Sequence, residues 1–151
     1  MTDRCNCYVP SSKKKIFSTD LGIDLQSGRE EDLFKWFLAC LLFGKPIQQE
    51  VAKRAYLELL KAGLITPEKV LEAGWDELVR VLDAGPYVRY DFSTATKLLE
   101  VCKMLKEKYG TITTLINQSG SSKELEQRLM EFKGVGPKTA EIFIRDLNRV
   151  L

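Results

Sequence analysis

Hydrophobic residues recur at helical spacing along most of the chain, and the most apolar stretch covers residues 30–43. Apolar side chains there would occupy most sides of a helix, so a mostly buried helix is predicted, with Gly44 ending it. Its recurring apolar positions are Leu33, Phe34, Phe37, Leu38, Leu41 and Leu42.

Proline, glycine and capping residues mark where further helices begin and end. Pro46 is predicted to open a second helix that continues to about Ala62. Thr66 and Pro67 provide an N-cap and a first helical residue for a short helix that ends near Ala73. Later helices are predicted over residues 75–82, 92–108, 112–118 and 122–132, the last with a capping box formed by Ser121 and Glu124. No segment shows sustained strand alternation, so the predicted fold is an all-α bundle of about eight helices.

The segment Leu129–Leu147 is predicted to join two helices through a tight turn, which makes residues 122–151 a helix-hairpin-helix motif. Gly134 and Gly136 can adopt backbone angles that other residues avoid, so the chain can reverse there and leave its amides bare. Pro137 suits the first position of the last helix. The free N–H groups of that helix, with Lys133 and Lys138 beside them, are typical of a phosphate-binding site.

Two other glycine motifs do not fit this turn. A dinucleotide fingerprint follows a strand and carries a third glycine, whereas Thr139 stands here after a helical segment. A phosphate-binding P-loop requires Gly-Lys-Thr, and Pro137 interrupts that sequence.

Composition and charge narrow the function. The chain has 151 residues, 44% hydrophobic residues and a net charge of +2, which favours a single folded domain whose nucleic-acid contacts depend on local charge. The longest apolar run is too short to span a membrane, and the N-terminus lacks the apolar core of a signal peptide, so a cytoplasmic protein is expected. The chain has no histidine; Cys5 and Cys7 are interpreted as free thiols, Cys40 and Cys102 as core thiols, and no metal site is expected.

Residues 1–28 are predicted to form an irregular N-terminal arm, and residues 29–151 the helical domain. The arm contains Pro10, Gly22 and the basic triplet 13–15. Such a short run of charge is more often solvated surface than a phosphate contact.

Three segments, in this order, resemble the endonuclease III-like helix-hairpin-helix DNA glycosylases of base-excision repair. They are the helix FLACLLF with the polar turn after it, the helix YDFSTATKLLEVCKMLKEKY, and the hairpin FKGVGPKTA. The hairpin is the most specific of the three, and the resemblance covers about four-fifths of the chain.

The resemblance implies double-stranded DNA as the partner, gripped at its phosphates by the hairpin and by a monovalent cation held in the turn. Lys138 matches the nucleophilic lysine of the bifunctional members, which attacks the sugar C1′ and forms a Schiff base. Such a lysine must be partly neutral, and Lys133 and Arg145 are candidates to lower its pKa. The turn after FLACLLF corresponds to the place where relatives carry the glutamine that fills the space of the flipped base. The DNA-binding residues implied are Lys45, Gln48, Lys133, Gly134, Val135, Gly136, Lys138 and Thr139.

The sequence also departs from the family pattern. The catalytic aspartate of relatives follows the second hairpin helix, whereas this sequence stops at Leu151, and Asp146 is interpreted as an ordinary acid on the helix surface. The four-cysteine iron–sulfur loop is absent, so no cofactor is expected. Three hypotheses stay open: a reduced glycosylase or abasic-site lyase, a DNA-binding domain without catalysis, and a protein-interaction domain. The last would use apolar residues of the hairpin and its final helix, namely Val135, Ile142, Phe143, Leu147, Val150 and Leu151.

Overall fold

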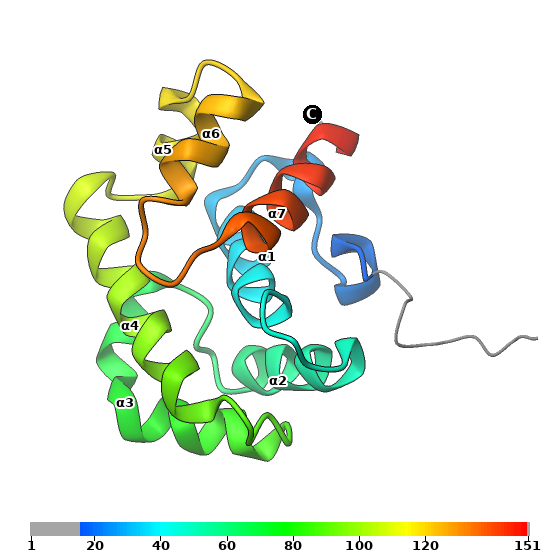
Figure 1. Cartoon of the computed structure of the whole chain (residues 1–151), viewed down its shortest axis with the longest axis vertical. Helices are drawn as coiled ribbons and strands as arrows, with labels where there is room; N and C mark the ends of the chain where they lie inside the picture. Colours follow the sequence, from blue (N-terminus) through cyan, green and yellow to red (C-terminus); the bar gives the residue numbers. More distant parts are fainter. Residues whose placement is uncertain (1–15, 151) are drawn as a thin grey trace, which may run out of the picture.

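The computed structural model describes residues 16–150, which form an all-helical fold (Figure 1). Seven α-helices follow two short 3-10 helices over these residues. The α-helices are α1 (Glu30–Phe43), α2 (Gln49–Lys61), α3 (Pro67–Ala84), α4 (Asp91–Lys108), α5 (Ile112–Gln118), α6 (Ser122–Leu129) and α7 (Pro137–Val150), and the 3-10 helices are η2 (Ser18–Leu21) and η3 (Leu25–Ser27). The prediction of an all-α fold is therefore confirmed for the described part of the chain.

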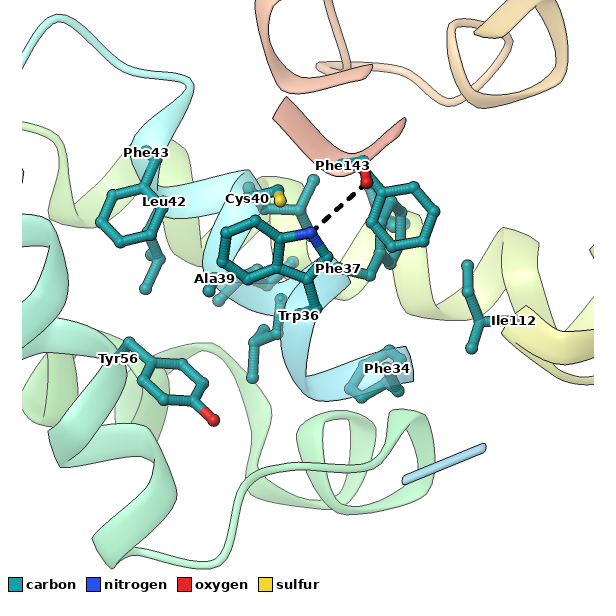
Figure 2. Packing of buried hydrophobic residues seen from close by; sticks show 14 of the residues in the cluster. Phe34, Trp36, Phe37, Ala39, Cys40, Leu42, Phe43, Tyr56, Ile112 and Phe143 are labelled. Carbon is teal, nitrogen blue, oxygen red and sulfur yellow. Dashed lines mark hydrogen bonds between the residues drawn. The ribbon is translucent and has the colours of Figure 1, made fainter. Parts of the chain in front are cut away.

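Helix α1 lies at the centre of the fold, as its apolar sequence predicts. It contacts α2, α4, α5 and α7, and every residue from Asp32 to Phe43 except Lys35 is buried. Figure 2 shows the aromatic side chains of α1 packed around Trp36, whose indole N–H donates to the carbonyl of Phe143 at 3.4 Å. The last helix of the chain is thus fixed against the first by both packing and a buried hydrogen bond.

The seven observed α-helices differ from the eight predicted because α3 joins two predicted helices. Gly74 has φ 81° and ψ 173° inside α3, and this kink lies between the helix predicted to end near Ala73 and the one predicted over residues 75–82. The start of α3 follows the prediction, since the Thr66 hydroxyl accepts the amide of Lys69 at 3.1 Å.

The predicted start of the second helix is wrong. Pro46 lies in an irregular turn, and α2 begins three residues later at Gln49. The amide of Ile47 donates to the carbonyl of Lys45 at 2.8 Å, which closes a tight local turn, and Gln48 is extended as the N-cap. The connection between α1 and α2 is therefore longer than the one predicted from a helix start at Pro46.

Residues 16–28 lie in the predicted arm, and the structure packs them onto the helical domain. Leu21, Ile23 and Leu25 are buried, and η3 contacts both α1 and α7. The guanidinium groups of Arg145 and Arg149 each lie 4.4 Å from the centre of the Phe17 ring. The segment is thus an additional layer over α7. The basic triplet 13–15 lies outside the described residues.

Both cysteines predicted to be core thiols are buried and free. Burial raises the pKa of the Cys102 thiol to about 12 and that of the Cys40 thiol well above its ordinary value. Both side chains therefore stay protonated near neutral pH and act as small apolar groups. Cys5 and Cys7 lie outside the described residues. Within residues 16–150, no helix is long and apolar enough to cross a bilayer.

Candidate functional site

The turn that carries the glycine motif connects α6 to α7 and is exposed at its tip (Figure 1). Gly134 has φ 90°, a left-handed conformation that favours glycine, and its surface is exposed. Gly136 is half-buried, and Pro137 is the first residue of α7, as predicted. Lys133 and Lys138, on either side of the glycines, are both exposed.

Buried side chains anchor the turn to the core, while other residues of the turn are exposed to solvent. Phe132 and Val135 are buried, and the amide of Val135 donates to the carbonyl of Phe132 at 3.1 Å. The amide of Ala140 donates to the carbonyl of Gly136 at 3.2 Å and starts the hydrogen-bond ladder of α7. The amides of Lys138 and Thr139 precede that first bond, so they are the groups that a helix N-terminus offers to an anion.

The turn between α1 and α2 packs directly against the start of α7. A Cβ atom on Gly44 would collide with the hydroxyl oxygen of Thr139, so the Thr139 side chain occupies the space that a side chain at position 44 would need. Thr139 is buried, which makes its side chain a packing contact; only its amide faces the predicted phosphate site through the helix end. The structure thus places the α1–α2 turn, which carries Lys45, next to the start of α7, although the two are nearly ninety positions apart by their numbers.

The side chains of the α1–α2 turn differ in their surroundings. The Lys45 ammonium lies 5.2 Å from the centre of the Tyr90 ring, and the Arg89 guanidinium lies 5.4 Å from the same ring. Gln48 is exposed, and its side chain makes no capping hydrogen bond with α2. Lys45 is therefore held by an aromatic neighbour, whereas Gln48 is free of its own helix end.

A buried lysine beneath the α6–α7 turn was not among the residues predicted from sequence. Lys97, on α4, is 7% exposed, and its ammonium donates to the carbonyl of Leu41 at 2.8 Å. Burial, together with the nearby charge of Lys45, lowers the pKa of Lys97 to about 8. One signal was present in the sequence: Lys97 lies on the face of α4 that carries Thr94, Leu98 and Val101, all of which are buried.

Two side chains satisfy the carbonyl groups at the C-terminal end of α1. Lys97 takes the carbonyl of Leu41, and the Tyr87 hydroxyl donates to the carbonyl of Leu42 at 2.9 Å. These carbonyls belong to the last turn of α1, where carbonyl groups have no hydrogen-bond partner within the helix. The negative end of the helix dipole lies at the same place. A buried ammonium is favourable at this position because it donates a hydrogen bond to a free carbonyl and places a positive charge at the negative end of the dipole.

Lys138, the candidate nucleophile, is exposed on the first turn of α7. The interpretation of Asp146 as a surface acid is wrong: the residue is 1% exposed. Its carboxylate accepts the amide of Ser18 at 2.7 Å and the Arg145 guanidinium at 2.8 Å. The N-terminal segment covers this part of α7, and the carboxylate is occupied in fastening it.

Three of the six apolar residues that an interaction domain would present are part of the core. Val135, Phe143 and Leu147 are buried, and Ile142 and Ile144 are half-buried. The side chain of Val150 and all of Leu151 lie outside what the structure describes. Over the described residues, the hairpin and α7 therefore do not offer Val135, Phe143 or Leu147 to a partner.

Among residues 16–150, no three Cys, Asp or Glu side chains gather in an arrangement that could hold a metal ion. Whether the protein uses a cofactor stays a prediction, as does the monovalent cation at the turn.

No family model, no curated protein and no solved structure matches this chain.

Proposed function

We propose that this protein binds double-stranded DNA through a helix-hairpin-helix motif of the base-excision-repair glycosylase type, with residues 133–139 gripping the phosphates. The observation that carries the proposal is the exposed glycine turn, which opens α7 with free amides between two exposed lysines, Lys133 and Lys138. Lys45 adds a third positive charge on the adjoining turn. The N-terminus of α7 and these cations all favour a negatively charged ligand.

The chemistry of this surface favours backbone phosphate over base edges. The groups on offer are amides and lysine ammonium groups, which suit phosphate oxygens and carry no sequence information. No helix of the described chain is proposed to enter a groove. Binding should therefore be weak, strongly dependent on salt, and similar for all duplex sequences.

The proposed base-excision-repair activity would use Lys138 as an amine nucleophile toward the sugar of an abasic site. Its exposure on the first turn of α7 leaves it open to such a substrate. The neighbouring amides would hold the adjacent phosphate and so position the sugar.

The test measures fluorescence anisotropy of a labelled duplex at several salt concentrations. We expect a log–log salt slope of about −0.9 for each phosphate contact neutralised. Lys133→Glu should weaken binding to every sequence by a similar factor, because it reverses a charge beside the turn. Lys61→Glu is the matched control, because this exposed lysine is the last residue of α2, about 18 Å along the helix from the α1–α2 turn.

Binding that is absent at low salt, or that does not respond to salt, would contradict the proposal. In that case a protein-interaction domain derived from this fold becomes the better hypothesis. Equal losses for Lys61→Glu and Lys133→Glu would show that the contact is general attraction and not a hairpin site.

A further inference from the structure

Gly134 meets another element of the fold at the tip of the hairpin. A Cβ atom at this position would lie 2.9 Å from Cδ and 3.0 Å from Cγ of Lys97. The stem of Lys97 therefore supports the turn from beneath, and glycine is required there both for its positive φ and for this contact. The ammonium at the end of the same side chain is anchored on the carbonyl of Leu41 in α1.

Lys97 thus joins three elements: α4, which carries it, the C-terminal end of α1, and the hairpin turn. A buried lysine has three donor hydrogens, and the structure gives it one acceptor, Leu41. A methionine stem would also lie beneath Gly134, but it would leave the carbonyl of Leu41 without this donor. The Lys97 charge thus serves the end of α1 and lies on the same side chain that supports the turn of the proposed phosphate site.

We propose that Lys97 is a positioning residue of the phosphate clamp: its stem fixes the Gly134 turn, and its buried charge makes phosphate binding at the hairpin coupled to proton uptake. The inference rests on the proposed function, because the phosphate is the group that would stabilise the charge. A bound phosphate near the hairpin favours the protonated amine, so the protein–DNA complex holds the Lys97 proton more tightly than the free protein does.

The charged and titratable groups on the surrounding elements include Arg89 and Tyr90, which lie beside Lys45. Lys45 lies on the α1–α2 turn, Lys133 and Lys138 on the hairpin, and Tyr87 on the loop before α4, where its hydroxyl is bound to Leu42. On α4 itself, Glu100 is exposed one turn beyond Lys97. Burial lowers the pKa of Lys97 to about 8, which places a titratable amine directly beneath the turn.

The experiment compares duplex affinity of the wild type, Lys97→Met and Lys97→Arg between about pH 7 and about pH 9 at constant low salt. Methionine keeps an unbranched stem without charge, and arginine keeps the charge throughout this range. We expect wild-type affinity to fall about threefold to tenfold over the range, within the tenfold per pH unit that one linked proton allows. Both variants should lack that fall, and Lys97→Met should bind more weakly than the wild type at the lower pH.

Calorimetry on the wild type alone provides a second measurement that does not depend on the variants folding. Binding near pH 8 in two buffers of different ionisation enthalpy should reveal uptake of part of one proton. Wild-type binding that shows no proton uptake, or the same pH dependence in Lys97→Met, overturns this inference and leaves the hairpin proposal standing. Absence of any binding at the lower pH overturns both.

Discussion

Gly44 and Thr139 face each other at the contact between the α1–α2 turn and the first turn of α7, with no room for a side chain on Gly44. Thr139 is buried, so its side chain has little free space into which to move away from a Cβ atom on Gly44. The start of α7 is therefore packed closely against the end of α1 through the Thr139 side chain.

This contact predicts that Gly44→Ala lowers the free energy of unfolding by about 1–3 kcal/mol, as overpacking in a core usually does. Urea unfolding followed by circular dichroism would measure it. Thr139→Ala removes the oxygen that a Gly44 Cβ atom would meet. The double variant Gly44→Ala/Thr139→Ala should therefore be more stable than the sum of the two single changes predicts.

Gly136→Ala is the matched control for the previous prediction. A Cβ atom on Gly136 would meet nothing within 4 Å, and the residue does not have positive φ. Its free energy of unfolding should change by less than about 0.5 kcal/mol. A similar loss at both glycines would mean that the Thr139 contact is not the cause.

A second prediction concerns the buried carboxylate of Asp146. Asp146→Ala removes the acceptor of the Ser18 amide and of the Arg145 guanidinium, and it leaves both donors without that partner. Loss of such a buried, charged acceptor should cost about 2–4 kcal/mol of stability. Glu141→Ala, an exposed change on the same helix, should cost less than about 0.5 kcal/mol.

If Asp146→Ala and Glu141→Ala unfold at the same urea concentration, the N-terminal segment does not depend on Asp146. Proteolysis gives an independent measure of that segment. Release of the Ser18 amide should make residues 16–28 easier to cleave in Asp146→Ala than in the wild type.

The features that sequence predicted well are those set by neighbouring residues. Pro137 opens α7, and the Ser121 hydroxyl accepts the amide of Glu124 at 3.1 Å, as the capping box requires. The Glu124 carboxylate returns to the amide of Gly120 instead of that of Ser121 itself. Local chemistry of this kind depends on three or four consecutive positions, so it is readable without the fold.

The features that sequence reasoning missed depend on residues far apart in the chain. Asp146 is buried because it meets Ser18, 128 positions away, and Lys97 because it meets Leu41, 56 positions away. Hydrophobic periodicity places a charged residue on the surface by default. Only the packed structure shows that these two charges have buried partners. The start of α2 was missed for another reason, since the turn around Ile47 prevails over the helix-starting preference of Pro46.

A third prediction concerns pH and the stability of the free protein. The pKa of Lys97 is about 8 in the folded chain and close to its ordinary value of 10.5 when unfolded. Between these values the unfolded chain binds more protons, so the free energy of unfolding contributed by Lys97 rises with pH and is lowest below about pH 8. The gain across this window should be no more than about 3 kcal/mol.

Urea unfolding of the wild type and Lys97→Met at a series of pH values would measure that gain, because all other titrating groups are shared. The unfolding free energy of the wild type relative to Lys97→Met should be lowest below about pH 8 and rise toward pH 10.5. A difference that stays constant over this range would mean that Lys97 titrates at its ordinary pKa.

The last prediction concerns chemistry at Lys138. Borohydride in the presence of a duplex with an abasic site should trap a covalent protein–DNA adduct if the Lys138 amine attacks the sugar, because the Schiff base is reducible. We expect slow trapping, since Lys138 is exposed and the one carboxylate buried in α7, that of Asp146, is bound to Ser18 and Arg145. A well-placed acid or base typically contributes about 10²–10⁴-fold, and an abasic site needs such help less than an intact nucleotide does.

Lys138→Ala should abolish trapping and reduce binding only slightly, because the amides of the turn are retained. Lys133→Ala is the matched control: it removes the other exposed hairpin lysine and should leave an adduct at the wild-type position. Mass spectrometry of the digested adduct would identify the linked lysine. An adduct that persists in Lys138→Ala would assign the chemistry to another amine. Rapid excision of a damaged base would show that a carboxylate such as Glu141 supports the reaction after all.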